Sequence, residues 1–233
     1  MTKCVNAFKL AFPRTIPIMA GFVFLGISYG VIMMNAGYSM AYPITTSAGV
    51  FAGSLEFLFV DLFRSPFNPF LILFLTLMVN ARHIFYGLSM LDKFKDTGWK
   101  KYFLIFGLCD ETFSMNCDLK LPKGIDKPWY MLHVTWLNYS YWVGGVIIGC
   151  VLSSILDVKI EGLDFVLTGL FLVIFVEQWL SHKNHIPALV GLLSSVFMFF
   201  IFKIFTKTPD YFALPSMVMM LLIFGYLYKK EVK

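Results

Sequence analysis

The chain has 233 residues, of which 58% are hydrophobic and only 14% charged, whereas a soluble globular domain has about 25% charged residues. This composition excludes an ordinary soluble domain and places the chain in a lipid bilayer. The formal net charge of +5 comes from short Lys and Arg clusters between long apolar runs, a pattern typical of cytoplasmic loops, which argues against nucleic acid as a partner.

The first apolar segment covers residues 16–34 and follows Lys3, Lys9 and Arg14. A charged start of this kind resembles a signal peptide. However, about 20 helical residues suffice to cross a hydrocarbon core of about 30 Å, and no small-residue cleavage site ends this run. We therefore predict that the segment is the first membrane helix.

Eight apolar segments follow one another along the chain and leave no room for a soluble domain. They cover residues 16–34, 44–63, 66–91, 102–117, 129–156, 163–180, 186–204 and 211–228. All are predicted to be helical, because lipid offers no hydrogen-bond partner to exposed backbone groups. Prolines mark several segment ends, where a missing N–H costs little: Pro43, Pro66, Pro69, Pro128, Pro187 and Pro209. We expect one all-α polytopic transmembrane domain over residues 1–233.

Three glycine pairs with four-residue spacing are predicted to be surfaces on which helices pack closely. The pairs are Gly26 with Gly30, Gly49 with Gly53, and Gly145 with Gly149.

The distribution of Lys and Arg distinguishes two topologies, both with cytoplasmic termini. If all eight segments cross the membrane, eleven basic residues lie inside and seven outside. The misfit is the loop 92–101, whose four lysines would lie outside, against the usual preference for cytoplasmic Lys and Arg.

In the second topology, segment 44–63 enters and leaves from the outer side as a broken helix, and segment 102–117 does the same from the inner side. Fourteen basic residues then lie inside and four outside. Gly49, Gly53 and Ser54 suit an interruption of the first of these segments, and the second is short for a full span. This topology predicts about six spanning helices, two re-entrant segments and room for an inverted repeat, an arrangement with which transporters build a site at mid-membrane.

Arg82 is the first buried charge. It lies ten residues before Asp92, or about 15 Å along a helix, which places its guanidinium near the middle of the membrane. Such a group needs an acceptor. It either forms a structural ion pair or serves substrate binding or ion coupling, and intramembrane ionisable groups usually belong to function.

Three carboxylates are the other candidates. Asp110 and Glu111 are adjacent, so their side chains point about 100° apart on a helix, and one can pair with Arg82 while the other exchanges a proton. With Thr112 they also fit the start of a half-helix. Glu56 lies within the other suspected broken helix. We expect it to serve as a proton relay or polar gate, or to be a group that reaches the membrane interface.

The remaining polar residues give weaker signals. Glu177 beside Trp179 is interpreted as an interfacial group, and the His182 and His185 pair lacks the partners of a metal site. Four cysteines show no CxxC pairing and are interpreted as small apolar residues, so neither a metal ion, a disulfide framework nor another cofactor is expected: Cys4, Cys109, Cys117 and Cys150.

Three ordered motifs resemble the AzlC family, the large subunits of bacterial branched-chain amino acid exporters. They are Ala-Gly-Ser-x-Glu-Phe at 52–57, Asn-x-Arg-His-x-x-Tyr-Gly at 80–87 and Asp-Glu-Thr-Phe at 110–113. The resemblance covers nearly the whole chain, although family members often carry Gln at position 56. The motifs and buried charges together give the expected substrate or ion pathway: Gly53, Ser54, Glu56, Asn80, Arg82, Tyr86, Asp110, Glu111 and Thr112.

The resemblance implies a permease in the cytoplasmic membrane that exports valine, leucine, isoleucine and, as a further candidate, methionine, together with a small hydrophobic AzlD-like subunit. No GxxxxGK[ST] phosphate-binding motif occurs in the chain, so we expect an ion gradient or a partner to supply the energy for transport. Protons are the expected coupling ion.

Two other classes of function compete with transport. An enzyme is not expected, because neither HExxH nor GxSxG is present. A membrane scaffold or assembly subunit that does not transport is the stronger alternative, since intramembrane charges can also hold subunits together.

Overall fold

The computed structural model describes residues 2–117, 119–156, 168–169, 172, 175–176, 179–180, 185–205, 215–216, 218–220 and 222–225. These residues form helices and connecting loops, and no strand occurs among them, which confirms the all-α class. The chain divides into two compact units, residues 1–168 and residues 169–233.

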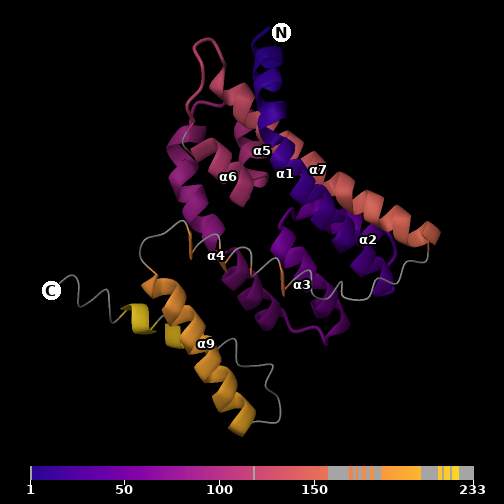
Figure 1. The fold of residues 1–233 in the computed structure, drawn as a ribbon, viewed down its shortest axis with the longest axis vertical. Coiled ribbons are helices and arrows are strands. Elements are labelled where there is room, and N and C mark those ends of the chain that lie inside the picture. The colour runs from indigo at the N-terminus through magenta and orange to yellow at the C-terminus, as the bar shows by residue number, and fades with distance from the viewer. Residues whose placement is uncertain are drawn as a thin grey trace, which may run out of the picture. The chain divides into compact units, whose positions relative to one another are not determined.

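The helices of the first unit follow the predicted segments in order (Figure 1). They are α1 (Thr2–Asn35), α2 (Ala41–Gly49), α3 (Gly53–Arg64), α4 (Pro69–Phe94), α5 (Lys100–Phe106), α6 (Asp110–Cys117) and α7 (Lys127–Leu156). In the second unit α9 covers Ile186–Phe205. Within the described ranges, α1, α4 and α7 are long and apolar enough to cross a membrane. The predicted segments 163–180 and 211–228 fall mostly outside the described residues, so the count of six crossings stays a prediction.

Helices α1 and α7 pack side by side along most of their lengths (Figure 1). Two glycine pairs permit this approach. A Cβ added at Gly26 would lie 2.8 Å from the Trp142 carbonyl oxygen, and one added at Gly145 would lie 2.8 Å from the Val23 carbonyl oxygen. Both pairs are therefore packing surfaces, as predicted. In the third pair the prediction is wrong for Gly49, where a Cβ would meet nothing within 4 Å, whereas a Cβ at Gly53 would lie 3.0 Å from the Trp142 ring.

The predicted interruption of segment 44–63 is confirmed, because α2 ends at Gly49 and α3 begins at Gly53. The two helices form a hairpin. The Phe63 ring, near the end of α3, lies 5.8 Å from the Tyr38 ring and 6.4 Å from the Tyr42 ring at the start of α2. The chain therefore returns to the end of the unit from which it came.

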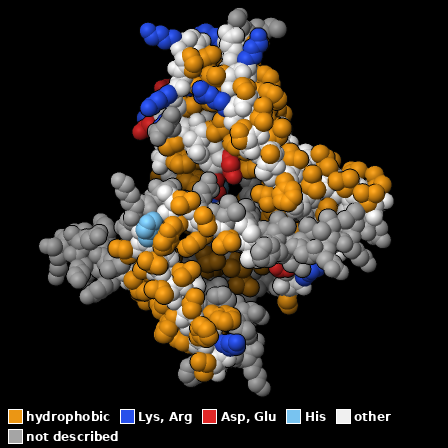
Figure 2. Space-filling model, viewed as in Figure 1, with side chains coloured by type: hydrophobic (Ala, Val, Ile, Leu, Met, Phe, Trp, Pro, Cys, Tyr) orange, Lys and Arg blue, Asp and Glu red, His pale blue; other side chains and the backbone are white. Residues whose placement is uncertain are grey.

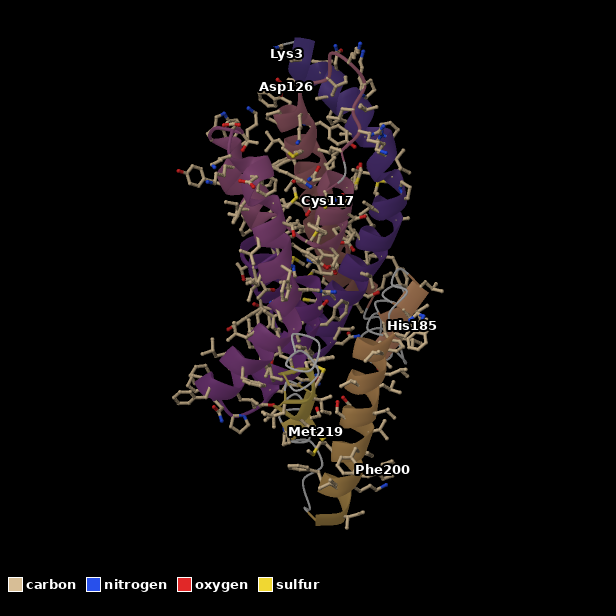
Figure 3. All side chains as sticks on the ribbon, turned by 90° about the vertical axis from the view of Figure 1, so that its left-hand side faces the viewer. Lys3, Cys117, Asp126, His185, Phe200 and Met219 are labelled. Atoms are coloured by element: carbon tan, nitrogen blue, oxygen red, sulfur yellow. The ribbon has the colours of Figure 1, made fainter. Side chains whose placement is uncertain are left out.

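Segment 102–117 is also interrupted, between Phe106 and Asp110, and its ends return together as well. The Lys100 ammonium lies 4.3 Å from the Trp129 ring near the start of α7, and the Lys93 ammonium near the end of α4 donates a hydrogen bond to the Cys117 carbonyl. The view in Figure 3 places Lys3 and Asp126 at this same end of the unit. The loop 92–101 and the N-terminus therefore share one end, as the broken-helix topology predicts.

Most basic residues of the first unit gather at that end (Figure 2), whereas Arg64 ends α3 and Arg82 lies near the middle of α4. Exposed lysines there are Lys3, Lys9, Lys95, Lys120, Lys123 and Lys127. The long helix α4 instead exposes large apolar side chains along one face, such as Phe70, Leu77 and Leu88, with exposed fractions of 82%, 54% and 61%. A face of this kind suits contact with lipid or with another membrane helix.

The tips of the two hairpins meet against the middle of α7. The Phe51 ring at the first break stacks 6.3 Å from the Phe106 ring at the second, and the Tyr139 ring of α7 lies 5.2 Å and 6.0 Å from them. The Tyr139 hydroxyl also donates a hydrogen bond of 3.0 Å to the Ala48 carbonyl. Phe51 has φ of 49°, a left-handed conformation that is rare for a bulky residue. This junction of two broken helices is the candidate site.

Candidate functional site

Helix α4 carries Arg82 near its middle, between the two hairpins. The helix begins in a regular way, because Pro69 occupies its first turn and the Asn68 side chain accepts a hydrogen bond from the Leu71 N–H. From Pro69 onwards no proline or break interrupts the helix, so Arg82 is held on a rigid element.

The Arg82 guanidinium joins the two half-helices. Its Nη1 atom lies 2.7 Å from Oδ2 of Asp110, the first residue of α6, and its Nη2 atom donates a hydrogen bond of 3.0 Å to Oγ of Ser54 in the first turn of α3. The structure thus pairs Arg82 with Asp110, and Ser54 is its second partner. One cation connects the N-terminal ends of both half-helices.

These N-terminal ends carry unsatisfied N–H groups and partial positive charge, which favour negative groups in the first turn. Glu56 occupies the first turn of α3, and Asp110 and Glu111 occupy the first turn of α6. The two helix starts therefore explain why the three carboxylates stand at these positions of the sequence. Arg82 lies between the two helix starts.

Glu56 is completely buried and connects the first break to α7. Its carboxylate accepts hydrogen bonds of 3.0 and 3.1 Å from Nε1 of Trp142, and a further one of 3.0 Å from the Ala52 N–H. Within the described ranges, no Lys or Arg lies within ion-pair distance of it. A glutamine oxygen could accept the same hydrogen bonds, so this geometry does not require a charge at position 56.

Thr112 and two glycines shape the breaks. The Thr112 hydroxyl accepts a hydrogen bond of 2.7 Å from the Cys109 N–H and donates one of 2.9 Å to the Gly107 carbonyl. A Cβ at Gly107 would overlap the Thr135 methyl group of α7, and one at Gly53 would lie 3.0 Å from the Trp142 ring. Thr112 and Gly53 thus fix the backbone on which the charged groups stand.

The other predicted site residues surround the ion pair less closely. Tyr86, one turn beyond Arg82, stacks on Phe113 with a centroid distance of 4.3 Å and lies close enough to interact with the Asp110 carboxylate. Glu111 is half-buried beside the Cys109 thiol, and no cation lies within ion-pair distance of it in the described part of the chain. Asn80 is half-buried on α4, and no contact described for it joins it to the Arg82 pair.

Two atoms of the ion pair have no protein hydrogen-bond partner among the described residues, although both are buried. They are Nε of Arg82, a donor, and Oδ1 of Asp110, an acceptor. Burying such atoms without partners costs free energy, and a bound molecule or water can satisfy them. A donor next to an acceptor can bind a carboxylate and an ammonium group together.

Several residues of the junction carry no local signal in the sequence. Trp142 was not predicted, because nothing in its local pattern distinguishes a tryptophan that binds Glu56 from one that packs. Phe51, Phe106 and Tyr139 lie within apolar segments rich in aromatic residues, where nothing in the pattern distinguishes a residue of the junction from one that only packs. Glu177 and His182 lie outside the described residues, while the His185 ring stacks on Trp179 in the second unit.

The family model described as "AzlC protein" matches residues 17–156. A protein of Bacillus subtilis (strain 168) named "Branched-chain amino acid transport protein AzlC" is 52% identical over 215 residues, which cover 92% of this chain and 83% of that protein. An "Uncharacterized membrane protein" of Haemophilus influenzae is 41% identical, with 91% of this chain and 86% of that protein covered.

A more distant relative is the "Inner membrane protein YgaZ" of Escherichia coli (strain K12), which is 24% identical and for which 79% of each chain is covered. No solved structure matches the chain. The matched region, residues 17–156, contains both hairpins, α4 and all of α7, so the junction lies wholly within it.

Proposed function

The chain belongs to the AzlC family, and from this premise we propose that it is the large subunit of a secondary transporter that exports branched-chain amino acids. The name of the Bacillus subtilis relative supports the substrate class. Valine, leucine and isoleucine are the expected substrates, with methionine as a further one. Discrimination among them is expected to be weak, since one methylene group contributes only about 1–3 kcal/mol in an apolar pocket.

The observation that carries the proposal is the Arg82 bridge between two half-helix starts. Oppositely entering broken helices that meet at mid-membrane are a recurrent way to build a transport site, in which helix ends face the charged groups of the substrate. Arg82 offers a free N–H donor and Asp110 a free carboxylate oxygen, which match the carboxylate and the ammonium of an amino acid. The aromatic rings of Phe51, Phe106 and Tyr139 supply an apolar surface for its side chain.

We assign the basic end of the first unit to the cytoplasm, because Lys and Arg prefer that side. The N-terminus, the loop 92–101 and the connection before α7 then lie inside the cell, and the hairpin of α2 and α3 enters from outside. With six crossings in all, the C-terminus is cytoplasmic too, and the chain is a multi-pass protein of the cytoplasmic membrane.

Proton coupling is the proposed source of energy. Glu111 stands beside Asp110 without a cation at ion-pair distance in the described part of the chain, so it can change its charge without breaking the Arg82 bridge. A carboxyl group that titrates next to a substrate site is a common element of proton-driven transporters.

A small hydrophobic subunit is the proposed partner, as the family resemblance implies. The apolar face of α4, with Phe70, Leu77 and Leu88, offers a membrane surface on which such a subunit could pack.

Counterflow of labelled leucine in proteoliposomes tests the proposal. The chain reconstituted with an AzlD-like subunit should accumulate label when the vesicles are preloaded with unlabelled leucine, and empty vesicles should not. If the partner alone gives full counterflow, this chain is a scaffold and not the transporter. If neither preparation transports leucine, valine or isoleucine, the substrate class is wrong.

A further inference from the structure

Helix α7 presents one face to both breaks. Thr135, Asn138 and Trp142 are spaced by three and four residues and therefore share a face of the helix. Thr135 packs against Gly107 at the second break, and Trp142 packs against Gly53 and binds Glu56 at the first. Asn138 lies between them along the helix, next to Tyr139, whose ring contacts the tips of both hairpins.

The Asn138 side chain is completely buried, and neither its amide nitrogen nor its amide oxygen has a hydrogen-bond partner among the described residues. A buried carboxamide without partners is costly, because both its donors and its acceptor have lost water. An apolar residue of similar size would fill the same space without that cost. The position therefore holds a polar group for which the described part of the chain provides no partner.

We propose that Asn138 binds the head group of the transported amino acid, an inference that rests on the transport function proposed above. A carboxamide donates to a carboxylate and accepts from an ammonium, so it can contact either charge of a zwitterion. Arg82 and Asp110, at the starts of the two half-helices, each have one buried atom without a partner among the described residues. The three residues come from α4, α6 and α7, and the substrate would draw these helices together.

A second asparagine provides a matched control. Asn116 is equally buried, at 1% exposure, and both its amide atoms also lack partners among the described residues. However, it lies one residue from the end of α6, next to Cys117, whose carbonyl is bound by Lys93. It is thus a turn and a half beyond Asp110, towards the basic end and away from the hairpin tips.

The test compares thermal unfolding of the full-length wild type, Asn138→Leu and Asn116→Leu, each together with the AzlD-like subunit in lipid nanodiscs, over a range of L-leucine concentrations. A ligand that binds only the folded protein raises the unfolding temperature. We expect both variants to unfold, without leucine, at the wild-type temperature or above it, because each loses an unsatisfied polar group. With leucine, the wild type and Asn116→Leu should be stabilised, while Asn138→Leu should need about tenfold more leucine or show no response.

Several results would overturn the inference. One is a normal leucine response in Asn138→Leu. Another is a lower unfolding temperature of Asn138→Leu without leucine, which would reveal a structural partner for the amide. A loss of response in both variants would show that the effect is not specific to position 138. If the wild type itself does not respond to leucine, the proposed function fails, and the inference falls with it.

Discussion

Two nitrogens of Arg82 find partners inside the membrane, one carboxylate and one hydroxyl from two different half-helices, while Nε has no partner among the described residues. Removing one member of a buried ion pair leaves the other charge without compensation, which costs about 3–5 kcal/mol. Neutralising both members avoids that cost. The pair can therefore be tested for a role in transport without leaving a buried charge behind.

Glu111 is the residue at which coupling and binding can be separated. Glu111→Gln keeps the size and the hydrogen bonding of the side chain but removes its titration. We expect this variant to exchange leucine across proteoliposome membranes at about the wild-type rate, and to lose net efflux driven by an imposed pH gradient. Asp96→Asn, which changes an exposed carboxylate in the loop between α4 and α5, is the control and should keep both activities. Efflux of Glu111→Gln at the wild-type rate would remove Glu111 from the proton pathway.

Among the helices, α1 and α7 depend on glycine for their close approach, and adjacent glycines on α7 allow a matched test. Gly145→Ala would place a methyl group 2.8 Å from the Val23 carbonyl oxygen, whereas Gly144 has open space around it. Because alanine favours a helix by roughly 1 kcal/mol over glycine, Gly144→Ala should unfold at the wild-type temperature or above. Gly145→Ala should unfold several degrees lower in a fluorescence melt. Equal melting temperatures for the two variants would contradict this packing.

The elements differ in how far the sequence predicts them. Both interruptions were predictable, because glycines at 49 and 53 and the unbalanced lysines of the loop 92–101 are local signals. The length of α1 was not predictable. The helix begins at Thr2 instead of near residue 16, because Ala7 and Ala11 pack against Tyr130 and Val134 of α7, and this contact depends on the tertiary structure.

The same limit applies to the site. Arg82 and Asp110 could be recognised as charges within apolar segments, but the choice of Asp110 over Glu111 as the partner depends on the direction in which α6 begins. The bond between Glu56 and Trp142 joins residues 86 positions apart, and no local pattern encodes it. The predicted packing role of Gly49 is wrong for the same reason, since the spacing of a glycine pair does not show whether another helix lies against it.

For the whole molecule, the basic end of the first unit gives a prediction about sidedness. In a chain whose native cysteines are replaced, a cysteine at Ser39, between α1 and α2, should react with a membrane-impermeant thiol reagent in intact cells. A cysteine at Asp96 should react only after the cells are permeabilised. Both positions are exposed, whereas the neighbouring Tyr38 ring packs against Tyr42 and Phe63. Labelling of position 96 from outside would invert or refute the broken-helix topology.

The central claim is that the bridge between the two broken helices is the transport site, and leucine counterflow by the Arg82→Ala, Asp110→Asn double variant tests it most directly. Because both buried charges are removed together, this variant should insert into the membrane and unfold at close to the wild-type temperature, yet give no counterflow above empty vesicles. Arg64→Ala, which removes an exposed arginine at the end of α3, should exchange leucine normally. Wild-type counterflow by the double variant would show that the pair only holds the helices together, and would contradict the claim.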